Sequence, residues 1–314
     1  MWNGFILATS EKMLEKAMQN NEFKTYHPIV NFTYFLFVIG FSCVFMNPVA
    51  LFISLVSSFI YSVMLKGKKT IKKNLIYMLP MTILIALINP LFNHQGVTIL
   101  YYLPSGNPMT LESVIYGILV SVMIFSVICW FSCYNEIMTS DKFIYLFGKI
   151  IPSLSLVFSM TLRFVPRFTE HLKVVINAQK CLGKDISSGN IIKRARNLIS
   201  ILSIMITWAL ENSIDTADSM KSRGYGDPNR TSFSIYTFNK RNTLSLLFIL
   251  ILGIYVLIGG FFGGFDFIYF PSIKMTSFSF YSISCYISYT LLCIYPITIN
   301  VKEEIRWKYL MQKI

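Results

Sequence analysis

The sequence contains few charged residues and few of the residue types that perform chemistry. Only 14% of its 314 residues are charged and 54% are hydrophobic, whereas roughly 25% of the residues in ordinary soluble domains are charged. The three histidines are scattered along the chain, and the six cysteines form no C-x-x-C pair. These absences disfavour a soluble domain, a metal site and a redox site, so we expect the cysteines to be small buried side chains.

A phosphate-binding loop is also missing. The stretch KGKKT at 66–70 has no glycine five residues before Gly67, and the GK pair at 183–184 is followed by Asp185 instead of Ser or Thr. A P-loop needs both features to hold phosphates and Mg²⁺. We therefore expect this chain to bind neither ATP nor any other cofactor.

The chain contains several apolar runs of about 20 residues, long enough to cross a bilayer. We expect six spans, near residues 29–46, 47–65, 74–91, 113–133, 243–262 and 276–300. Their cores contain no Asp, Glu, Lys, Arg or His, which argues against a proton-coupled carrier. An intramembrane hydrolase is also disfavoured, because it needs an activated nucleophile beside a base. The sequence predicts an all-α integral membrane protein with about six transmembrane helices.

The net charge of +13 is distributed as membrane topology requires. The loop between the second and third spans contains KGKKTIKK at 66–73, whereas residues 92–112 contain no Lys or Arg, and the loop at 263–275 contains only Lys274. Because cytoplasmic loops of membrane proteins are rich in Lys and Arg, this pattern predicts a multi-pass protein of the cell membrane with both termini in the cytoplasm. It explains the positive charge better than nucleic-acid binding does.

Three regions follow from these patterns. Residues 1–133 would contain four spans, and residues 242–314 two more spans and a cytoplasmic tail. Residues 134–241 would form a cytoplasmic module, because they contain about half of the basic residues and no uninterrupted span. Within this module we expect two long amphipathic helices, at 154–182 with a bend at Pro166 and at 190–223, each closed by a left-handed glycine, Gly183 or Gly224.

The end of the second long helix allows two interpretations. Arg223 followed by Gly224 could be an ordinary helix end, since a cation near a C-terminus is worth about 0.3–1 kcal/mol. Alternatively, Arg223 is an exposed guanidinium on a rigid helix end that docks into an acidic groove of a partner, where its planar donor fork would pair with carboxylates. Glu211, Asp215, Asp218 and Ser222 form a polar stripe that leads to this end.

Several stretches of the chain resemble the transmembrane (T) component of energy-coupling factor transporters, the family that includes the cobalt-type permeases. The resemblance covers roughly residues 26–241. The stretches that carry it are YHPIVNFTYF at 26–35, NPLFNHQGVTILYYLPSGNP at 89–108, CYNEIMTSDKFIYLFG at 133–148, LRFVPRF at 162–168 and ENSIDTADSMKSRGYGDPNRTSFSIY at 211–236.

This resemblance implies that two cytoplasmic coupling helices each end in an Ala-Arg-Gly-like motif that sits in a groove of an ATPase subunit. The second motif then corresponds to Ser222-Arg223-Gly224, and the first to Cys181-Leu182-Gly183. The first motif departs from the family pattern because Leu182 occupies the arginine position, with Lys180 two residues earlier. The two ATPase contacts are therefore expected to differ.

The resemblance further implies a complex of two ATP-binding ATPase subunits, this non-catalytic scaffold in the bilayer, and a small membrane subunit that binds a vitamin or a metal ion. The long helices would transmit ATP-driven motion to that subunit. Candidates for this contact are Phe158, Met160, Phe164, Met205 and Trp208; packing against other helices or lipid is the alternative. The alternative function is a stand-alone channel or secondary carrier, which would transport without partners.

Overall fold

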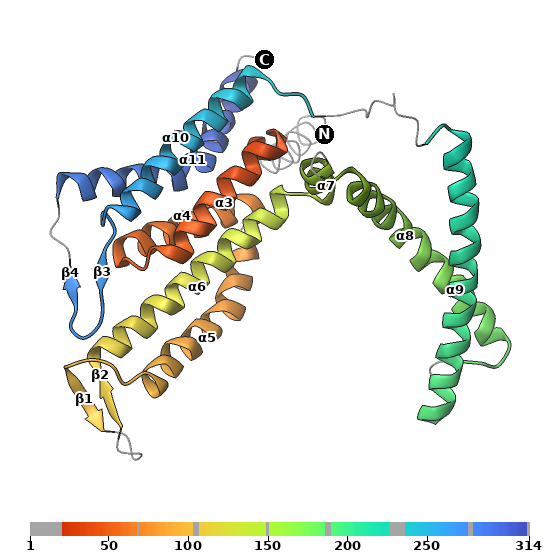
Figure 1. Ribbon diagram of the computed structural model, residues 1–314, viewed down its shortest axis with the longest axis horizontal. Coiled ribbons are helices and arrows are strands. Elements are labelled where there is room, and N and C mark those ends of the chain that lie inside the picture. The colour runs from red at the N-terminus through yellow and green to blue at the C-terminus, as the bar shows by residue number, and fades with distance from the viewer. Residues whose placement is uncertain are drawn as a thin grey trace, which may run out of the picture. The chain divides into compact units, whose positions relative to one another are not determined.

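The computed structural model describes residues 21–67, 69–102, 107–148, 151–185, 190–225, 236–275 and 279–312. The chain divides into two compact units (Figure 1). The membrane unit comprises Met1–Phe143 and Tyr236–Ile314, and the second unit comprises Ile144–Ile235. The predicted cytoplasmic module of 134–241 includes the whole second unit. Each unit is described by itself.

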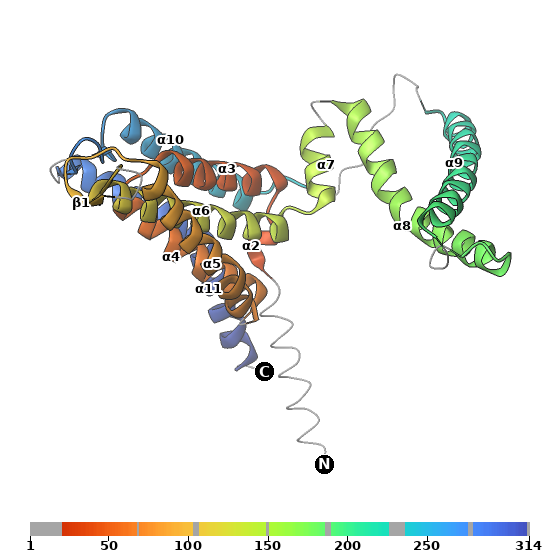
Figure 2. The same cartoon turned by 90° about the horizontal axis from the view of Figure 1, so that it is seen from below.

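Within the described residues, the membrane unit contains the short helix α2 and six longer helices that overlap the six predicted spans. They are α2 (Glu22–Thr25), α3 (Pro28–Val44), α4 (Pro48–Lys66), α5 (Lys69–Phe92), α6 (Leu111–Ile137), α10 (Lys240–Phe261) and α11 (Phe280–Met311). Proline begins α3 and α4, where its missing N–H would be unpaired in any case. Helix α6 packs against α3, α4 and α5, while α11 packs against α4 and α10 (Figure 1, Figure 2).

By length and hydropathy, α4, α6, α9, α10 and α11 could each cross a membrane. Helix α3, with 17 residues, and the stretch Met78–Phe92 of α5 are shorter apolar helices. Helix α9 belongs to the second unit, and its mean hydropathy of 1.3 is the lowest of the five. The fold is that of an all-α multi-pass membrane protein, as predicted.

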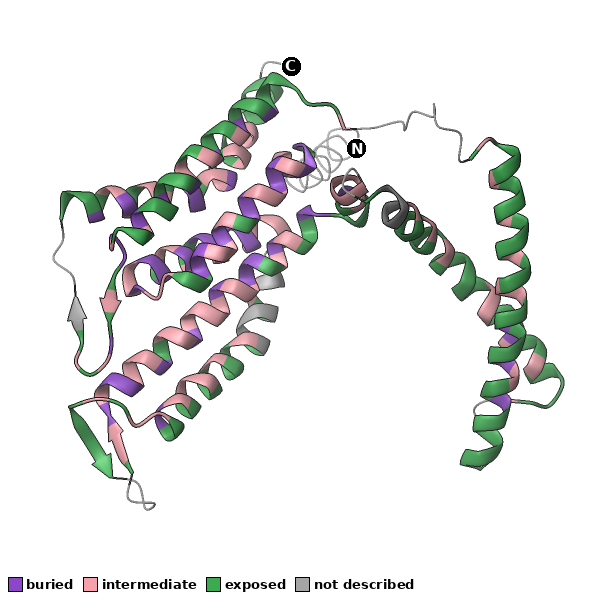
Figure 3. Ribbon diagram, viewed as in Figure 1, coloured by how far each residue is buried: buried purple, intermediate pink, exposed green. Residues whose placement is uncertain are grey.

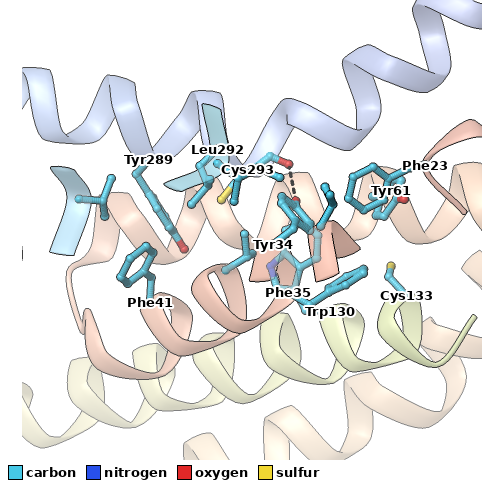
Figure 4. Close-up of a cluster of buried hydrophobic side chains, with 14 of the residues drawn as sticks. Phe23, Tyr34, Phe35, Phe41, Tyr61, Trp130, Cys133, Tyr289, Leu292 and Cys293 are labelled. Atoms are coloured by element: carbon cyan, nitrogen blue, oxygen red, sulfur yellow. Dashed lines mark hydrogen bonds between the residues drawn. The ribbon is translucent and has the colours of Figure 1, made fainter. Parts of the chain in front are cut away.

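Aromatic rings gather in the centre of the membrane unit (Figure 4), and buried serines lie among the same helices. Ser54 bonds to Ser42 and to Ser126, both at 2.6 Å, and accepts from Trp130 Nε1 at 3.0 Å. Ser42 also bonds to Tyr289. This serine chain joins α3, α4, α6 and α11 by hydrogen bonds between helices, a usual role of hydroxyl side chains in membrane spans.

The sequence did not predict two short hairpins, β1 (Ile99–Tyr102) with β2 (Pro108–Thr110) and β3 (Phe267–Ile268) with β4 (Lys274–Met275). The buried Glu112, at the start of α6, accepts hydrogen bonds from Thr98 N and from Thr98 Oγ1. This carboxylate therefore holds the loop before the first hairpin strand.

The sixth predicted span ends near residue 300, and a cytoplasmic tail was expected after it. Helix α11 continues without a break to Met311. Two ion pairs at helical spacing, Glu303–Arg306 and Glu304–Lys308, support the added turns, although pairs of this kind contribute only about 0.3–0.5 kcal/mol each.

The second unit contains the two long helices that the sequence predicts, α8 (Pro152–Cys181) and α9 (Ile191–Ser222). Pro166 lies inside α8. The shorter helix α7 (Ser140–Gly148) runs across the boundary between the units in the sequence. Figure 3 shows that exposed residues predominate along α8 and α9, because few side chains are buried where the two helices meet.

Candidate functional site

Helix α8 ends in a Schellman motif at the first predicted helix end. The N–H of Gly183 donates to Lys180 O at 3.0 Å, and the N–H of Lys184 donates to Gln179 O at 3.0 Å. Gly183 has φ +73°, the left-handed conformation that this motif requires and that glycine adopts without a steric penalty. Leu182 is the capping residue, and its side chain is 70% exposed.

Helix α9 ends in the same motif. The N–H of Gly224 donates to Lys221 O at 3.0 Å, the N–H of Tyr225 donates to Met220 O at 3.0 Å, and Gly224 has φ +71°. Arg223 occupies the capping position, with φ −88° and ψ 13°, against −83° and 10° at Leu182. The left-handed glycine predicted at each end is confirmed, and the two ends have nearly the same backbone geometry.

The side chain of Arg223 faces solvent. It is exposed, and within the described part of the chain it forms no ion pair and no side-chain hydrogen bond. Ser222, beside it, donates back to Ser219 O within its own helix. At the other end, Cys181 is an exposed free thiol and Lys180 lies 4.0 Å from Asp185. The guanidinium is thus available to a partner, whereas the first end offers a leucine.

The predicted polar stripe of α9 is present. Its four members, Glu211, Asp215, Asp218 and Ser222, are all exposed. They lie on the helix turns that precede the capping position, so the surface that leads to Arg223 is acidic. A partner that binds the end of α9 would therefore meet a cation at the tip and anions behind it.

Two of the five residues predicted to contact a partner are instead packed between α8 and α9. Met205 is 1% exposed and forms a small core with Val175 and Ile201. Trp208 is half-buried, and its ring stacks on His171 with centroids 4.1 Å apart. For these two residues the structure shows packing against the neighbouring helix, the alternative considered above.

The other three predicted contact residues lie on α8. Phe158 is 48% exposed, while Met160 and Phe164 are half-buried. They remain on the surface of the second unit, so the structure is compatible with their having a partner. No contact of theirs with α9 is among the described interactions.

Sequence reasoning missed a second apolar face, on α9. Its members are strongly exposed and recur at helical spacing: Ile191, Leu198, Leu202, Ile206 and Leu210. On the helix they lie beside the face that contains Ile201 and Met205, which is packed against α8. The signal was visible in the sequence, since α9 has more apolar positions than one packed face can use.

An apolar groove of about 660 Å³ lies between α3 and α10 in the membrane unit. It is lined by aliphatic and aromatic side chains, by Gly40 and Gly260, and by Asp266 at one end. Four of the cysteines are buried as predicted, whereas Cys43 and Cys181 are exposed. Within the described residues, no group of three His, Cys, Asp or Glu side chains is placed to hold a metal ion.

Comparison with known proteins gives the same family that the sequence stretches resemble. The model of the family described as CbiQ, cobalt transport protein, matches residues 21–233. The energy-coupling factor transporter transmembrane protein EcfT of Lactobacillus helveticus is 36% identical over 111 residues, 35% of this chain and 40% of that protein. EcfT of Streptococcus thermophilus is 37% identical over 102 residues, 32% of this chain and 39% of that protein. The matched segment thus spans about two-fifths of the length of these relatives.

Proposed function

The chain belongs to the family of the cobalt transport protein CbiQ, and from that premise we propose that it is the coupling subunit of an energy-coupling factor importer. It would transmit ATP-driven motion from two ATPase subunits to a separate membrane subunit that binds the substrate, a vitamin or a metal ion. The chain itself would be non-catalytic. The similarity to EcfT proteins supports membership in such a transporter.

The observation that carries the proposal is the pair of matching helix ends. Two long helices of one unit stop in the same Schellman motif, and each presents its capping residue to solvent. A left-handed glycine ends a helix abruptly, so the side chain before it stands on a rigid terminus. Two such ends in one chain suit an assembly with two ATPase subunits, one for each end.

Arg223 would provide the stronger of the two contacts. Its guanidinium has no partner within the described residues, and a carboxylate groove would bind it in a bidentate geometry. Leu182 can only fill an apolar depression. Closure of the ATPases on ATP would move both ends, and α8 and α9 would respond as a pair because Val175, Ile201 and Met205 pack between them.

The exposed apolar faces of α8 and α9 would receive the substrate-binding subunit. Phe158 on α8 and the face of α9 that contains Leu198, Leu202 and Ile206 are exposed. Contiguous apolar surface of this kind marks a protein or membrane contact. This interpretation moves the predicted contact from Met205 and Trp208 to neighbouring positions on the same helices.

The proposed orientation places the second unit and both termini in the cytoplasm. The basic residues near the exposed Arg223 and around α8 and α9 belong to that side by the positive-inside rule. The low hydropathy of α9 relative to α4, α6 and α10 and its exposed charged stripe fit an interfacial helix better than a span.

Co-purification tests the assignment. The full chain is expressed with a pair of candidate ATPases and a candidate substrate-binding subunit, and a tag on this chain is used for isolation. We expect both ATPases and the small subunit to co-elute, and ATP-dependent uptake to appear in proteoliposomes only when all of them are present. The purified chain alone should hydrolyse no ATP, because it lacks a P-loop.

A stand-alone channel or secondary carrier predicts the opposite result. Proteoliposomes with this chain alone would then take up substrate without ATP or partners. Uptake by the chain alone, or ATP turnover that follows the chain through further purification, would contradict the proposed function.

A further inference from the structure

Residues 22–31, which comprise α2 and the start of α3, contact both places where the chain passes between the two units. We call them the corner segment. The chain leaves the membrane unit after Phe143 and returns to it at Tyr236. Side chains next to each of these points bind the corner segment, and all of these contacts lie inside the membrane unit.

Lys142 holds the outgoing connection. It is 5% exposed, and its ammonium donates to the backbone carbonyl of Lys24. The hydrogen-bond network assigns the orientation of the Asn31 amide: Oδ1 accepts from Lys142 Nζ at 2.9 Å, and Nδ2 donates to Phe23 O at 3.0 Å. The last turn before the unit boundary is thereby bound to α2 and α3.

Aromatic rings and Arg241 hold the returning connection. The ring of His27 lies edge-on to Phe238, with centroids 4.9 Å apart, and to Tyr236 at 6.3 Å. Arg241 donates to Glu22 at 3.3 Å and to Thr25 at 3.1 Å. Its guanidinium also lies 4.4 Å from the centre of the Tyr26 ring.

Burying the Lys142 ammonium without a carboxylate partner costs free energy of folding. Within the described residues no carboxylate lies within 4.0 Å of its ammonium, so the charge is buried against neutral acceptors. Burial and the nearby Lys24 lower the pKa of Lys142 to about 8. Even a buried ion pair can often be replaced by apolar side chains of similar volume without loss of stability. A lone buried ammonium is therefore better explained by the specific geometry that it imposes.

We propose that the corner segment is the joint that holds both connections between the two units, with Lys142 and Phe238 as positioning residues for coupling. The inference rests on the proposed function in assigning coupling as the purpose. Motion of the second unit can reach the membrane unit along the chain only through these two connections. Because one ten-residue segment holds both, movement at either connection acts on the same short stretch, α2 and the start of α3.

Hydrogen exchange on the purified chain tests the anchoring without any partner. In Lys142→Met, we expect the backbone amides of residues 24–31 to exchange at least about threefold faster, with the thermal transition unchanged. The matched control is Lys302→Met, which removes an exposed lysine from α11 and should leave these amides as in the wild type. Unchanged exchange in Lys142→Met would overturn the anchoring.

The second connection provides an independent variant. Phe238→Ala should raise exchange in the same residues, because it removes the ring packed on His27. The control Phe280→Ala removes a ring that is 95% exposed and should have no effect there. An effect confined to residues 236–242 would show two separate anchors and would overturn the single joint.

The assembled transporter tests the purpose. With both ATPases and the substrate-binding subunit present, Lys142→Met and Phe238→Ala should keep assembly and ATP hydrolysis but lower uptake several-fold, so that more ATP is hydrolysed per substrate transported. A purely structural role would lower hydrolysis and uptake together. Failure of the wild-type complex to assemble would count against the proposed function. An unchanged ratio of ATP hydrolysed to substrate transported in both variants would overturn the role of the joint.

Discussion

The ends of α8 and α9 have the same backbone and different side chains. Leu182 and Arg223 both occupy the capping position of a Schellman motif, and their φ and ψ angles agree within a few degrees. One end exposes an aliphatic side chain and the other a guanidinium without a described partner. Both helices therefore end in the same way, but only the α9 end has a capping residue, Arg223, that can form an ion pair.

This difference separates the role of the glycine, which ends the helix, from the role of the residue before it, which a partner can bind. The glycine determines where the helix stops, because only a residue that tolerates positive φ closes it in this way. The residue before it determines what a partner can bind. In the proposed complex, both ATPase contacts would depend on the shape of the helix end, and only the contact at Arg223 would depend on charge.

Reversing the charge at the α9 end should have the largest effect. Arg223→Glu should weaken ATPase binding at least about thirtyfold, since losing one member of a buried charge pair costs about 2–5 kcal/mol and a like charge is added. Leu182→Glu should weaken it less, because no ion pair is lost. Titration of ATPase subunits onto the chain in nanodiscs measures both.

Lys221→Glu is the matched control for this comparison. It makes the same change of charge two residues earlier on an exposed position. If Lys221→Glu is as damaging as Arg223→Glu, the effect is one of general surface charge. If Leu182→Glu is the more damaging variant, the order of the two contacts is reversed and our assignment is wrong.

Substituting the glycines should affect both ends equally. Gly183→Ala and Gly224→Ala place a Cβ at φ +73° and +71°, which costs about 1–2 kcal/mol in the left-handed region. The amides of Lys184 and Tyr225, which close the two motifs, should exchange faster by similar factors. If protection from exchange is lost at one end alone, the two motifs differ in stability, and the two helix ends are not equivalent in backbone structure.

Adding the missing arginine should have the smallest effect. Leu182→Arg should change ATPase binding by no more than about fivefold, equivalent to about 1 kcal/mol, because in the proposed complex a groove that receives a leucine needs no carboxylate. Leu182→Met, with a similar volume and no charge, is the control. A gain of two orders of magnitude would mean that the groove at the α8 end contains a carboxylate that Leu182 leaves unused.

Most of the helical architecture could be predicted from the sequence. Long uncharged runs mark spans because the bilayer excludes unpaired polar groups, and the glycines at 183 and 224 mark helix ends. The residues at both helix ends could be predicted because capping depends on the local sequence alone. The length of α11 did not follow from the hydropathy, which marks only the end of the apolar run; the charged residues after that run pair along the helix.

The long-range contacts could not be predicted in the same way. Nothing local to Met205 distinguishes a buried methionine from an exposed one, and the packing with Val175 depends on how α8 and α9 align. The contacts of Lys142 with Lys24 and Asn31 join residues more than a hundred positions apart. Such pairings follow from tertiary packing, and the sequence alone marked only residues 26–31 of the corner segment, as part of a stretch that resembles the family.

The serine chain of the membrane unit fixes the register of four helices. Sliding α4 by one residue against α3 and α6 would separate Ser54 from Ser42, Ser126 and Trp130 together, and the apolar surroundings offer no water to replace those bonds. Shear between these helices is therefore opposed at one central point. A displacement applied at the corner segment should therefore move α3, α4, α6 and α11 together, with little slippage between them.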